Sequence, residues 1–148
     1  MTAEIWFGYV LELLPGLLKA LELTGIALAL GYPLALVMAL LIDSAPRPIA
    51  WLSIAFVEVG RGIPLLVLLY IFYQGLPQID IVPTAMNAAI AAFTWSTAGY
   101  ATEIIRSSLQ SVPNGQLEAA SSVGLSDADR FRFVILPQAA RIAIPPLM

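Results

Sequence analysis

The run of apolar residues from Thr24 to Ile42 contains no charged side chain, and it restricts the possible fold more than any other feature of the sequence. As an α-helix this run would measure about 28 Å, close to the hydrocarbon thickness of a bilayer. Of the 148 residues, 59% are hydrophobic and 11% are charged, whereas a soluble domain carries about 25% charged residues. We therefore predict an all-α membrane protein.

Two further apolar segments follow this first predicted transmembrane helix. The second, Ile49 to Tyr73, contains Glu58 and Arg61, although one charge at the centre of a membrane helix costs roughly 2.5–3.5 kcal/mol. The third, Thr84 to Ala101, begins after Pro83, which suits the first turn of a helix. Prolines predict the connections between the helices, a turn at Asp43–Pro48 and a loop at Gln74–Pro83.

The segment that precedes the first apolar run has no basic region and no small-residue cleavage site, so a cleaved secretory signal is not expected. Its aromatic residues Trp6, Phe7 and Tyr9 predict a short helix at the membrane surface. Arginines gather near the Asp43–Pro48 turn and from Arg106 onward, and cytoplasmic loops are enriched in basic residues. The N-terminus is therefore expected outside, and the C-terminal third inside.

A polar interlude, 111–137, separates the third apolar segment from the C-terminal residues. Pro113-Asn114-Gly115 predicts a turn, and Gln116 to Val123 predicts a short helix that stops at Gly124. Ser126 with Asp129 resembles a capping box that opens a second short helix, ending at Pro137. Two short helices joined at a glycine would form a compact knob. Gln138–Met148 is expected to open a further helix.

The spacing within this interlude resembles the cytoplasmic coupling loop of ABC importer permeases. The resemblance rests on Glu118-Ala119-Ala120, then Gly124 after three residues, then a hydrophobic stretch that closes on Leu136-Pro137. The family has Ile two residues before the Leu-Pro pair, where this chain has Val134. The resemblance covers nearly the whole chain. Two more segments are similar to the polar-amino-acid uptake family: Glu58-Val59-Gly60-Arg61-Gly62-Ile63-Pro64 and Tyr100-Ala101-Thr102-Glu103-Ile104-Ile105-Arg106.

The resemblance implies a type I ABC importer-like fold in the bacterial inner membrane. Residues 1–148 would form one transmembrane permease domain, with about three complete transmembrane helices, the coupling loop at 111–137 and the start of a fourth helix. Because members carry about five such helices, the chain is expected to be truncated at its C-terminus. The expected partners are an ABC ATPase subunit, a second permease subunit, an extracytoplasmic solute-binding protein and the lipid bilayer, with no nucleic acid.

Glu58 and Arg61 are spaced three residues apart, as are Glu103 and Arg106, so each pair can neutralise itself on one helix face. The alternative is cross-pairing between helices, Glu58 with Arg106 and Glu103 with Arg61, at a gate that the knob rearranges. A third group, Asn87, Thr94 and Thr97, falls close to one helical stripe and supplies candidates for lining a path. These side chains could equally bond within their own helix.

The sequence offers no enzymatic chemistry of its own, so energy for transport would come from ATP hydrolysis by a partner. It has no Gly-x4-Gly-Lys-Ser/Thr phosphate loop, no nucleophile with a base, and neither His nor Cys. No metal and no cofactor are expected. Three alternatives remain, of which the first is the main rival: a pore- or channel-forming subunit without ATPase coupling, an intramembrane hydrolase, and a membrane assembly factor that transports nothing.

Overall fold

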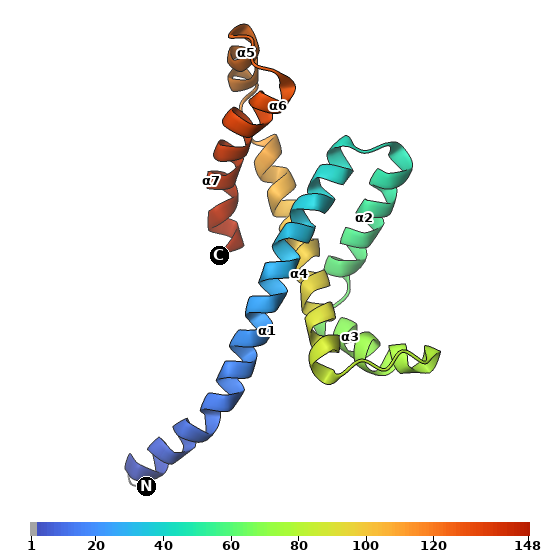
Figure 1. The fold of residues 1–148 in the computed structure, drawn as a ribbon, viewed down its shortest axis with the longest axis vertical. Helices are drawn as coiled ribbons and strands as arrows, with labels where there is room; N and C mark the ends of the chain where they lie inside the picture. Colours follow the sequence, from blue (N-terminus) through green and yellow to red (C-terminus); the bar gives the residue numbers. More distant parts are fainter. Residues whose placement is uncertain (1–2) are drawn as a thin grey trace.

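The computed structural model describes the backbone of residues 3–148 and the side chains of residues 12–148. The predicted all-α class is confirmed, since the described backbone is helical and contains no strand. Three helices form the main body: α1 (Ala3–Ser44), α2 (Arg47–Gly62) and α4 (Ala85–Gln110). Helix α4 crosses α1 and packs against α2 (Figure 1).

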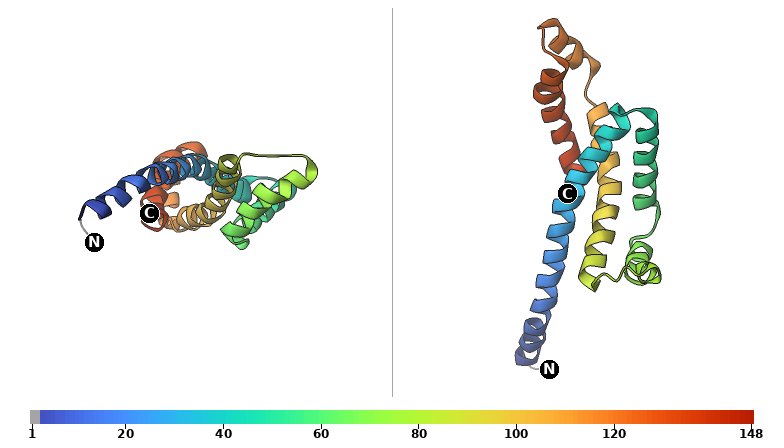
Figure 2. Two further views of the ribbon diagram at one scale, coloured as in Figure 1. Left: turned by 90° about the horizontal axis from the view of Figure 1, so that it is seen from below. Right: turned by 45° about the vertical axis from the view of Figure 1, so that its right-hand side comes forward.

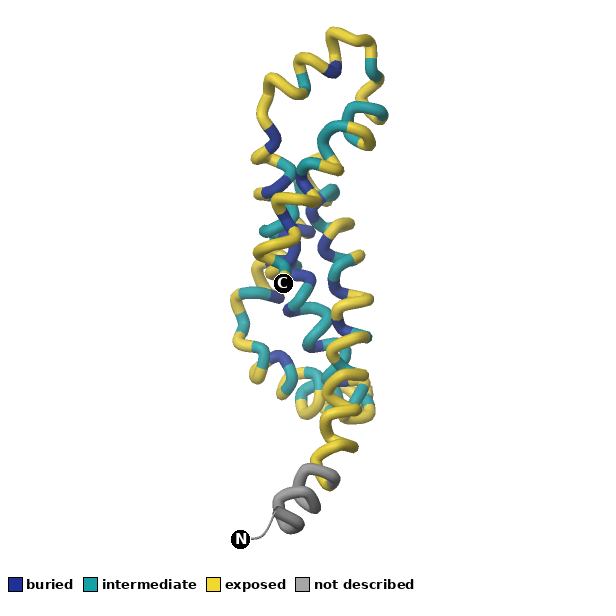
Figure 3. Tube along the Cα trace, turned by 90° about the vertical axis from the view of Figure 1, so that its left-hand side faces the viewer, coloured by how far each residue is buried: buried dark blue, intermediate teal, exposed yellow. Residues whose placement is uncertain are grey.

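Helix α1 is continuous from Ala3 to Ser44, so the predicted separate N-terminal helix is not a separate element. The continuous run of good helix formers, mainly Leu and Ala, outweighs the breaking tendency of Pro15 and Pro33. The side chains of Trp6, Phe7 and Tyr9, predicted to lie at the membrane surface, fall outside the described side chains. Between residues 12 and 30 most of α1 is exposed, and the part nearest residue 12 extends beyond the other helices (Figure 3).

The turn predicted at Asp43–Pro48 is shorter than expected. Only Ala45 and Pro46 separate α1 from α2, because Pro46 occupies the N-cap of α2 and Pro48 lies in the first helical turn, where no backbone donor is needed. Asp43 therefore belongs to the last turn of α1. This short connection sets α2 antiparallel to the end of α1 (Figure 1).

The second predicted transmembrane helix is broken rather than continuous. Ile63 and Pro64 are extended, since a residue before proline is disfavoured in the α-region. Helix α3 (Leu65–Tyr70) and the helical turns that continue it to Ile79 leave α2 at 103°. Most of the loop predicted at Gln74–Pro83 is thus helical. The helical part ends at Asp80, which has a positive φ of 62°.

Small residues allow the long helices to approach closely at the centre of the fold. Ala35, Ala98 and Ala101 form a fully buried cluster between α1 and α4. On the α2 side, a Cβ atom placed on Gly99 would lie 2.9 Å from the backbone nitrogen of Arg61, and one on Gly60 would meet Trp95. Close backbone approach through small residues is a common way for membrane helices to associate, and buried residues concentrate along these crossings (Figure 3).

The C-terminal part forms a hairpin-like extension beyond α4, made of α5 (Asn114–Ser122), α6 (Asp127–Asp129), a π-helical turn (Arg130–Ile135) and α7 (Leu136–Leu147). Helix α7 returns toward the main body and packs against α4 (Figure 2). The α1–α2 turn and α5 lie toward one end of the molecule, and the α3–α4 connection lies at the other (Figure 1). The predicted orientation, with the N-terminus outside and the C-terminal third inside, stays a prediction.

By length and composition, Glu12–Ser44 of α1 is one helix able to cross a membrane, and α2 with α3 qualifies as a second if the bent pair counts as one span. Helix α4 is not among the helices that meet this criterion, and its sequence is rich in neutral polar side chains such as Asn87, Thr94 and Ser96. The predicted number of about three complete transmembrane helices therefore stays a prediction.

Candidate functional site

Helix α5 ends in a Schellman motif, which reverses the chain at the predicted glycine. The amide of Leu125 donates to Ala120 O at 3.2 Å, and the amide of Gly124 donates to Ser121 O at 3.0 Å. Gly124 has a φ of +79°, a conformation that only glycine adopts without strain. The predicted end of the helix at Gly124 is confirmed, although α5 already begins at Asn114, within the predicted turn.

The second half of the knob is tied to the first by polar contacts. Ser126 caps α6 by accepting a hydrogen bond from the amide of Asp129 at 3.2 Å, and its hydroxyl donates to the Asp129 carboxylate at 2.7 Å. Arg130 pairs with Asp127 and donates to the hydroxyl of Ser121 in α5 at 2.6 Å. Residues 114–130 therefore form one compact unit, which we call the coupling knob.

The tip of the coupling knob is exposed and acidic. Glu118, Ala119 and Gly124 are exposed, while Ala120 is buried. Val123, beside the glycine turn, is 76% exposed. Segment 114–129 contains three acidic residues and no basic one: Glu118, Asp127 and Asp129. An acidic tip is unfavourable on an anionic lipid surface, and an exposed valine at its apex suits contact with another protein.

The Leu136–Pro137 pair does not end a helix, which corrects the prediction. Helical structure runs on from Asp127 to Leu147, with Pro137 in the first turn of α7. The π-helical turn just before it explains this continuity, because the Leu136 amide donates to Phe131 O, five residues back. A wider turn relieves the clash that a proline ring makes with the carbonyl four residues earlier. Leu76–Pro77 follows a second π-helical turn in the same way.

The charged pairs form within helices, and the alternative cross-pairs are not formed among the described side chains. Arg61 contacts Glu58 at 2.5 Å, and Arg106 lies 3.5 Å from Glu103. Arg106 makes its shorter ion pair, at 2.8 Å, with Asp43 at the end of α1. Sequence reasoning missed Asp43 because it lay in a predicted turn. The available signal was a carboxylate in a last helical turn that contains no basic residue, which is unfavourable unless another helix supplies a cation.

Two of the three predicted path-lining residues share one hollow. Asn87 and Thr94 line an open space of about 450 Å³ together with the aromatic rings of Phe56, Phe72 and Trp95. The Trp95 indole donates to Phe56 O at 2.9 Å and stacks on the Phe56 ring. Thr97 lies elsewhere, against Gly31 of α1. The predicted stripe is therefore divided between a hollow and a helix contact.

One residue that lines the hollow carries a polar group without a partner. Thr94 Oγ1 is buried and has no hydrogen-bond partner, and it is the one such side-chain atom among those the structure describes. Buried hydroxyl groups are usually paired, and an exception calls for a physical explanation. This oxygen is enclosed by neighbouring atoms, so water or a solute in the hollow reaches the hydroxyl only if those neighbours move.

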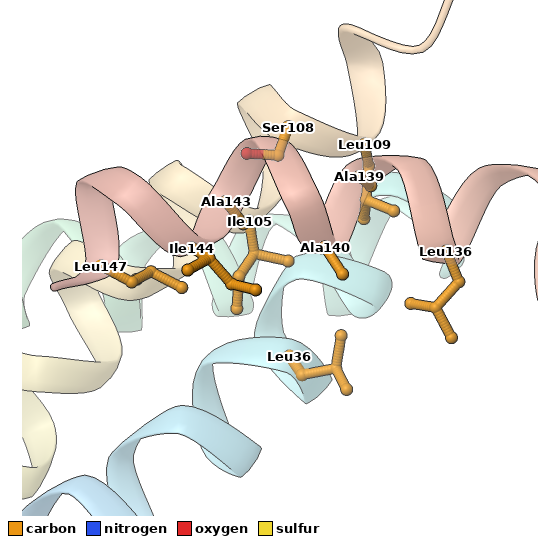
Figure 4. A pocket seen from close by; sticks show the side chains of 10 residues that line it. All are labelled: Leu36, Ile105, Ser108, Leu109, Leu136, Ala139, Ala140, Ala143, Ile144 and Leu147. Carbon is orange, nitrogen blue, oxygen red and sulfur yellow. The ribbon is translucent and has the colours of Figure 1, made fainter.

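A second cavity, of about 200 Å³, lies between α4 and α7 and is apolar (Figure 4). Its one polar lining side chain, Ser108, donates to Ile104 O of its own helix at 2.7 Å. Because the other lining groups are aliphatic, this cavity offers no recognition of a polar solute. The hollow at Thr94 is the better candidate for a transport path.

Comparison with known proteins identifies the family. The family model described as "Binding-protein-dependent transport system inner membrane component" matches residues 31–148. The chain belongs to this family. A probable glutamine ABC transporter permease protein of Bacillus subtilis is 37% identical over 99% of this chain and 68% of its own length. An L-cystine transport system permease protein of Bacillus subtilis is 39% identical over 89% of this chain and 56% of its own length.

Solved structures agree with this family assignment. A chain in the crystal structure of an amino acid ABC transporter with histidines superposes with a TM-score of 0.90 at 36% identity, over 99% of this chain and 69% of that chain. A chain of the MetNI methionine ABC transporter superposes with a TM-score of 0.68 at 20% identity, a likeness of fold. The predicted type I importer-like fold is confirmed. This chain spans 56–69% of the length of these proteins.

Proposed function

We propose that this chain is the membrane-spanning permease subunit of an ATP-driven importer for polar amino acids. The observation that carries the proposal is the coupling knob, which presents Glu118, Ala119 and Gly124 on an exposed tip at the end of α4. The amino-acid substrate is inferred from relatives named for glutamine and L-cystine transport. Family members are transport components, so ATP hydrolysis is assigned to a separate subunit.

In this proposal the coupling knob lies on the cytoplasmic side and docks on the ATPase. The N-terminus and the Asp80 turn then lie outside, where a solute-binding protein delivers the substrate. The hollow at Thr94 forms part of the path, and a second permease subunit completes its wall. The division of the structure into two ends, with arginine-containing turns at the knob end, supports this orientation.

The experiment reconstitutes the chain with its ATPase and binding protein in liposomes and measures ATP-dependent uptake of labelled amino acids. Glu118→Lys should abolish uptake and co-purification of the ATPase, since it reverses one charge of the tip. Gln116→Lys is the control, because it also introduces a lysine, on the opposite side of α5, without removing an acidic residue. Uptake that persists in Glu118→Lys would contradict the coupling role. Ion conductance without any ATPase would favour a channel instead.

A further inference from the structure

The ion pair between Asp43 and Arg106 differs in kind from the other ion pairs of the described side chains. Four of those five pairs join residues three apart in sequence, so each lies within one helical segment. The Asp43–Arg106 pair joins residues 63 apart, on two different helices. It is therefore the one of these pairs that connects separate elements of the fold.

The geometry of this pair is well defined. Arg106 donates to Asp43 Oδ1 through Nε at 3.1 Å and through Nη2 at 2.8 Å, while Nη1 lies 3.5 Å from Glu103 Oε1. The Arg106 side chain is 24% exposed, and that of Asp43 is 32% exposed. Three contacts thus hold the guanidinium plane between α1 and α4, and hydrogen bonds between charged groups are stronger than neutral ones.

The position of Asp43 makes the pair more than an incidental surface contact. Asp43 lies in the last turn of α1, where a carboxylate faces the negative end of the helix dipole, and that turn contains no basic residue. Arg106 supplies the missing cation from α4. An acidic residue at this position would destabilise an isolated α1. We therefore interpret Asp43 as one half of an interhelix contact.

The pair also has a distinctive place along α4. Arg106 lies one turn before Gln110, where α4 ends and the chain continues into the coupling knob. One turn in the other direction, the Thr102 hydroxyl lies 3.3 Å from Ala35 O of α1. Helices α1 and α4 are thus joined at two levels, and two contacts fix their relative angle where one would leave a pivot.

We propose that Asp43 and Arg106 are positioning residues that form a strut between the stem of the coupling knob and the α1–α2 turn. When the knob is displaced, α4 and the α1–α2 turn move as one body because the strut holds them together. The inference rests on the proposed function, and it assigns a transmission role to an aspartate outside the motifs that carry the family resemblance.

The first experiment measures the ATP hydrolysed per amino acid imported by the reconstituted complex. Asp43→Asn should raise this ratio about 3- to 10-fold, since residues on a coupling route change coupling by factors of this size. Asp43→Glu, which keeps the charge, should restore most of the coupling. Glu22→Gln is the control, because it removes an exposed pair with Lys19 that lies within α1 alone.

Several outcomes would overturn the strut. One is an unchanged ratio in Asp43→Asn, and another is an equal loss in Asp43→Asn and Asp43→Glu. An Asp43→Asn chain that no longer assembles with the ATPase would show a purely structural role. Absence of ATP-dependent uptake by the wild-type complex would instead contradict the proposed function, and it would leave the second experiment as the test of the strut.

The second experiment measures the distance between spin labels on Ser44→Cys and Gln110→Cys, which is possible because the chain contains no other cysteine. The strut predicts one narrow distance distribution for the chain in liposomes, with the same maximum with and without ATP-bound partner. Asp43→Asn should broaden it. A wild-type distance that changes with nucleotide, or a distribution that Asp43→Asn leaves narrow, would contradict the proposal.

Discussion

Two threonines of α4 have the same side chain in opposite surroundings. Thr102 is fully buried, and its hydroxyl donates to Ala98 O at 2.6 Å and approaches Ala35 O at 3.3 Å. The hydroxyl of Thr94 is buried without a partner, on a residue that lines the hollow. The first hydroxyl contributes to stability, whereas the second serves no structural contact among the described residues.

Substitution by valine separates these two roles. Thr102→Val should lower the free energy of unfolding by about 0.5–1.5 kcal/mol, because it removes the hydrogen bond that the hydroxyl donates. Thr94→Val should leave stability unchanged or slightly higher, since replacing an unpaired buried hydroxyl by a methyl group is not costly. Amino-acid uptake should fall in Thr94→Val. Thermal unfolding in detergent and uptake in liposomes provide the measurements, and a destabilised Thr94→Val with normal uptake would contradict this account.

Gly124 and Gly115 provide a second comparison at the residue scale. An added Cβ meets no atom within 4 Å at either glycine, but Gly124 has a φ of +79°. Gly124→Ala should therefore destabilise the coupling knob by about 1–2 kcal/mol, whereas Gly115→Ala, in the first turn of α5, should stabilise it by up to about 1 kcal/mol. Hydrogen exchange of the α5 amides measures both. Equal protection in the two variants would show that the turn is not strained.

At the scale of elements, the contact between α2 and α4 depends on the absence of side chains. A Cβ on Gly99 would lie 2.9 Å from Arg61 N and 3.2 Å from Val57 O, and backbone atoms cannot move aside as a flexible side chain would. Gly99→Ala should cost about 1–3 kcal/mol of stability through overpacking. Gly25→Ala, an open position on α1, should be neutral or stabilising. Similar unfolding temperatures for both variants would contradict the tight contact.

At this scale, a feature could be predicted from the sequence where it depends on neighbouring residues. Gly124 and Ser126 act through neighbouring backbone groups, so their roles could be predicted from the sequence. The helix ends at prolines were harder to predict from the sequence. Pro64 breaks a helix, yet Pro137 is accommodated by the π-helical turn before it. A preceding wide turn leaves no clear mark in residue types, so the end predicted at Pro137 was wrong.

Contacts between distant residues could not be predicted from spacing. The sequence placed Glu58, Arg61, Glu103 and Arg106 in two pairs, and the intrahelical alternative is the one that forms. The partner that joins Arg106 to α1 is Asp43, 63 residues away, and only the crossing of the helices brings the two together. For the same reason, Asn87 and Thr94 could be placed on one stripe of α4, but the aromatic wall opposite them could not be foreseen.

At the scale of the whole molecule, the proposed function requires that force on the coupling knob reaches the main body, and the packing offers two routes. One passes along α4, through its close contacts with α1 and α2, and the other along α7, which packs back against α4. Because the core contains small side chains and tight backbone contacts, we expect it to transmit a displacement of the knob rather than absorb it. In the proposed function, an ATPase engages the knob from the cytoplasmic side.

Engagement of the knob by an ATPase can be tested by placing one cysteine at Val123, the exposed apex of the knob, in a chain that has no other. In right-side-out and inside-out membrane vesicles, a membrane-impermeant maleimide should label Val123→Cys in the inside-out vesicles alone. A short bifunctional crosslinker should then join this position to the ATPase subunit, with a yield that changes when ATP is bound. Labelling from the outer face, or an intact complex in which no crosslink to the ATPase forms, would contradict the account.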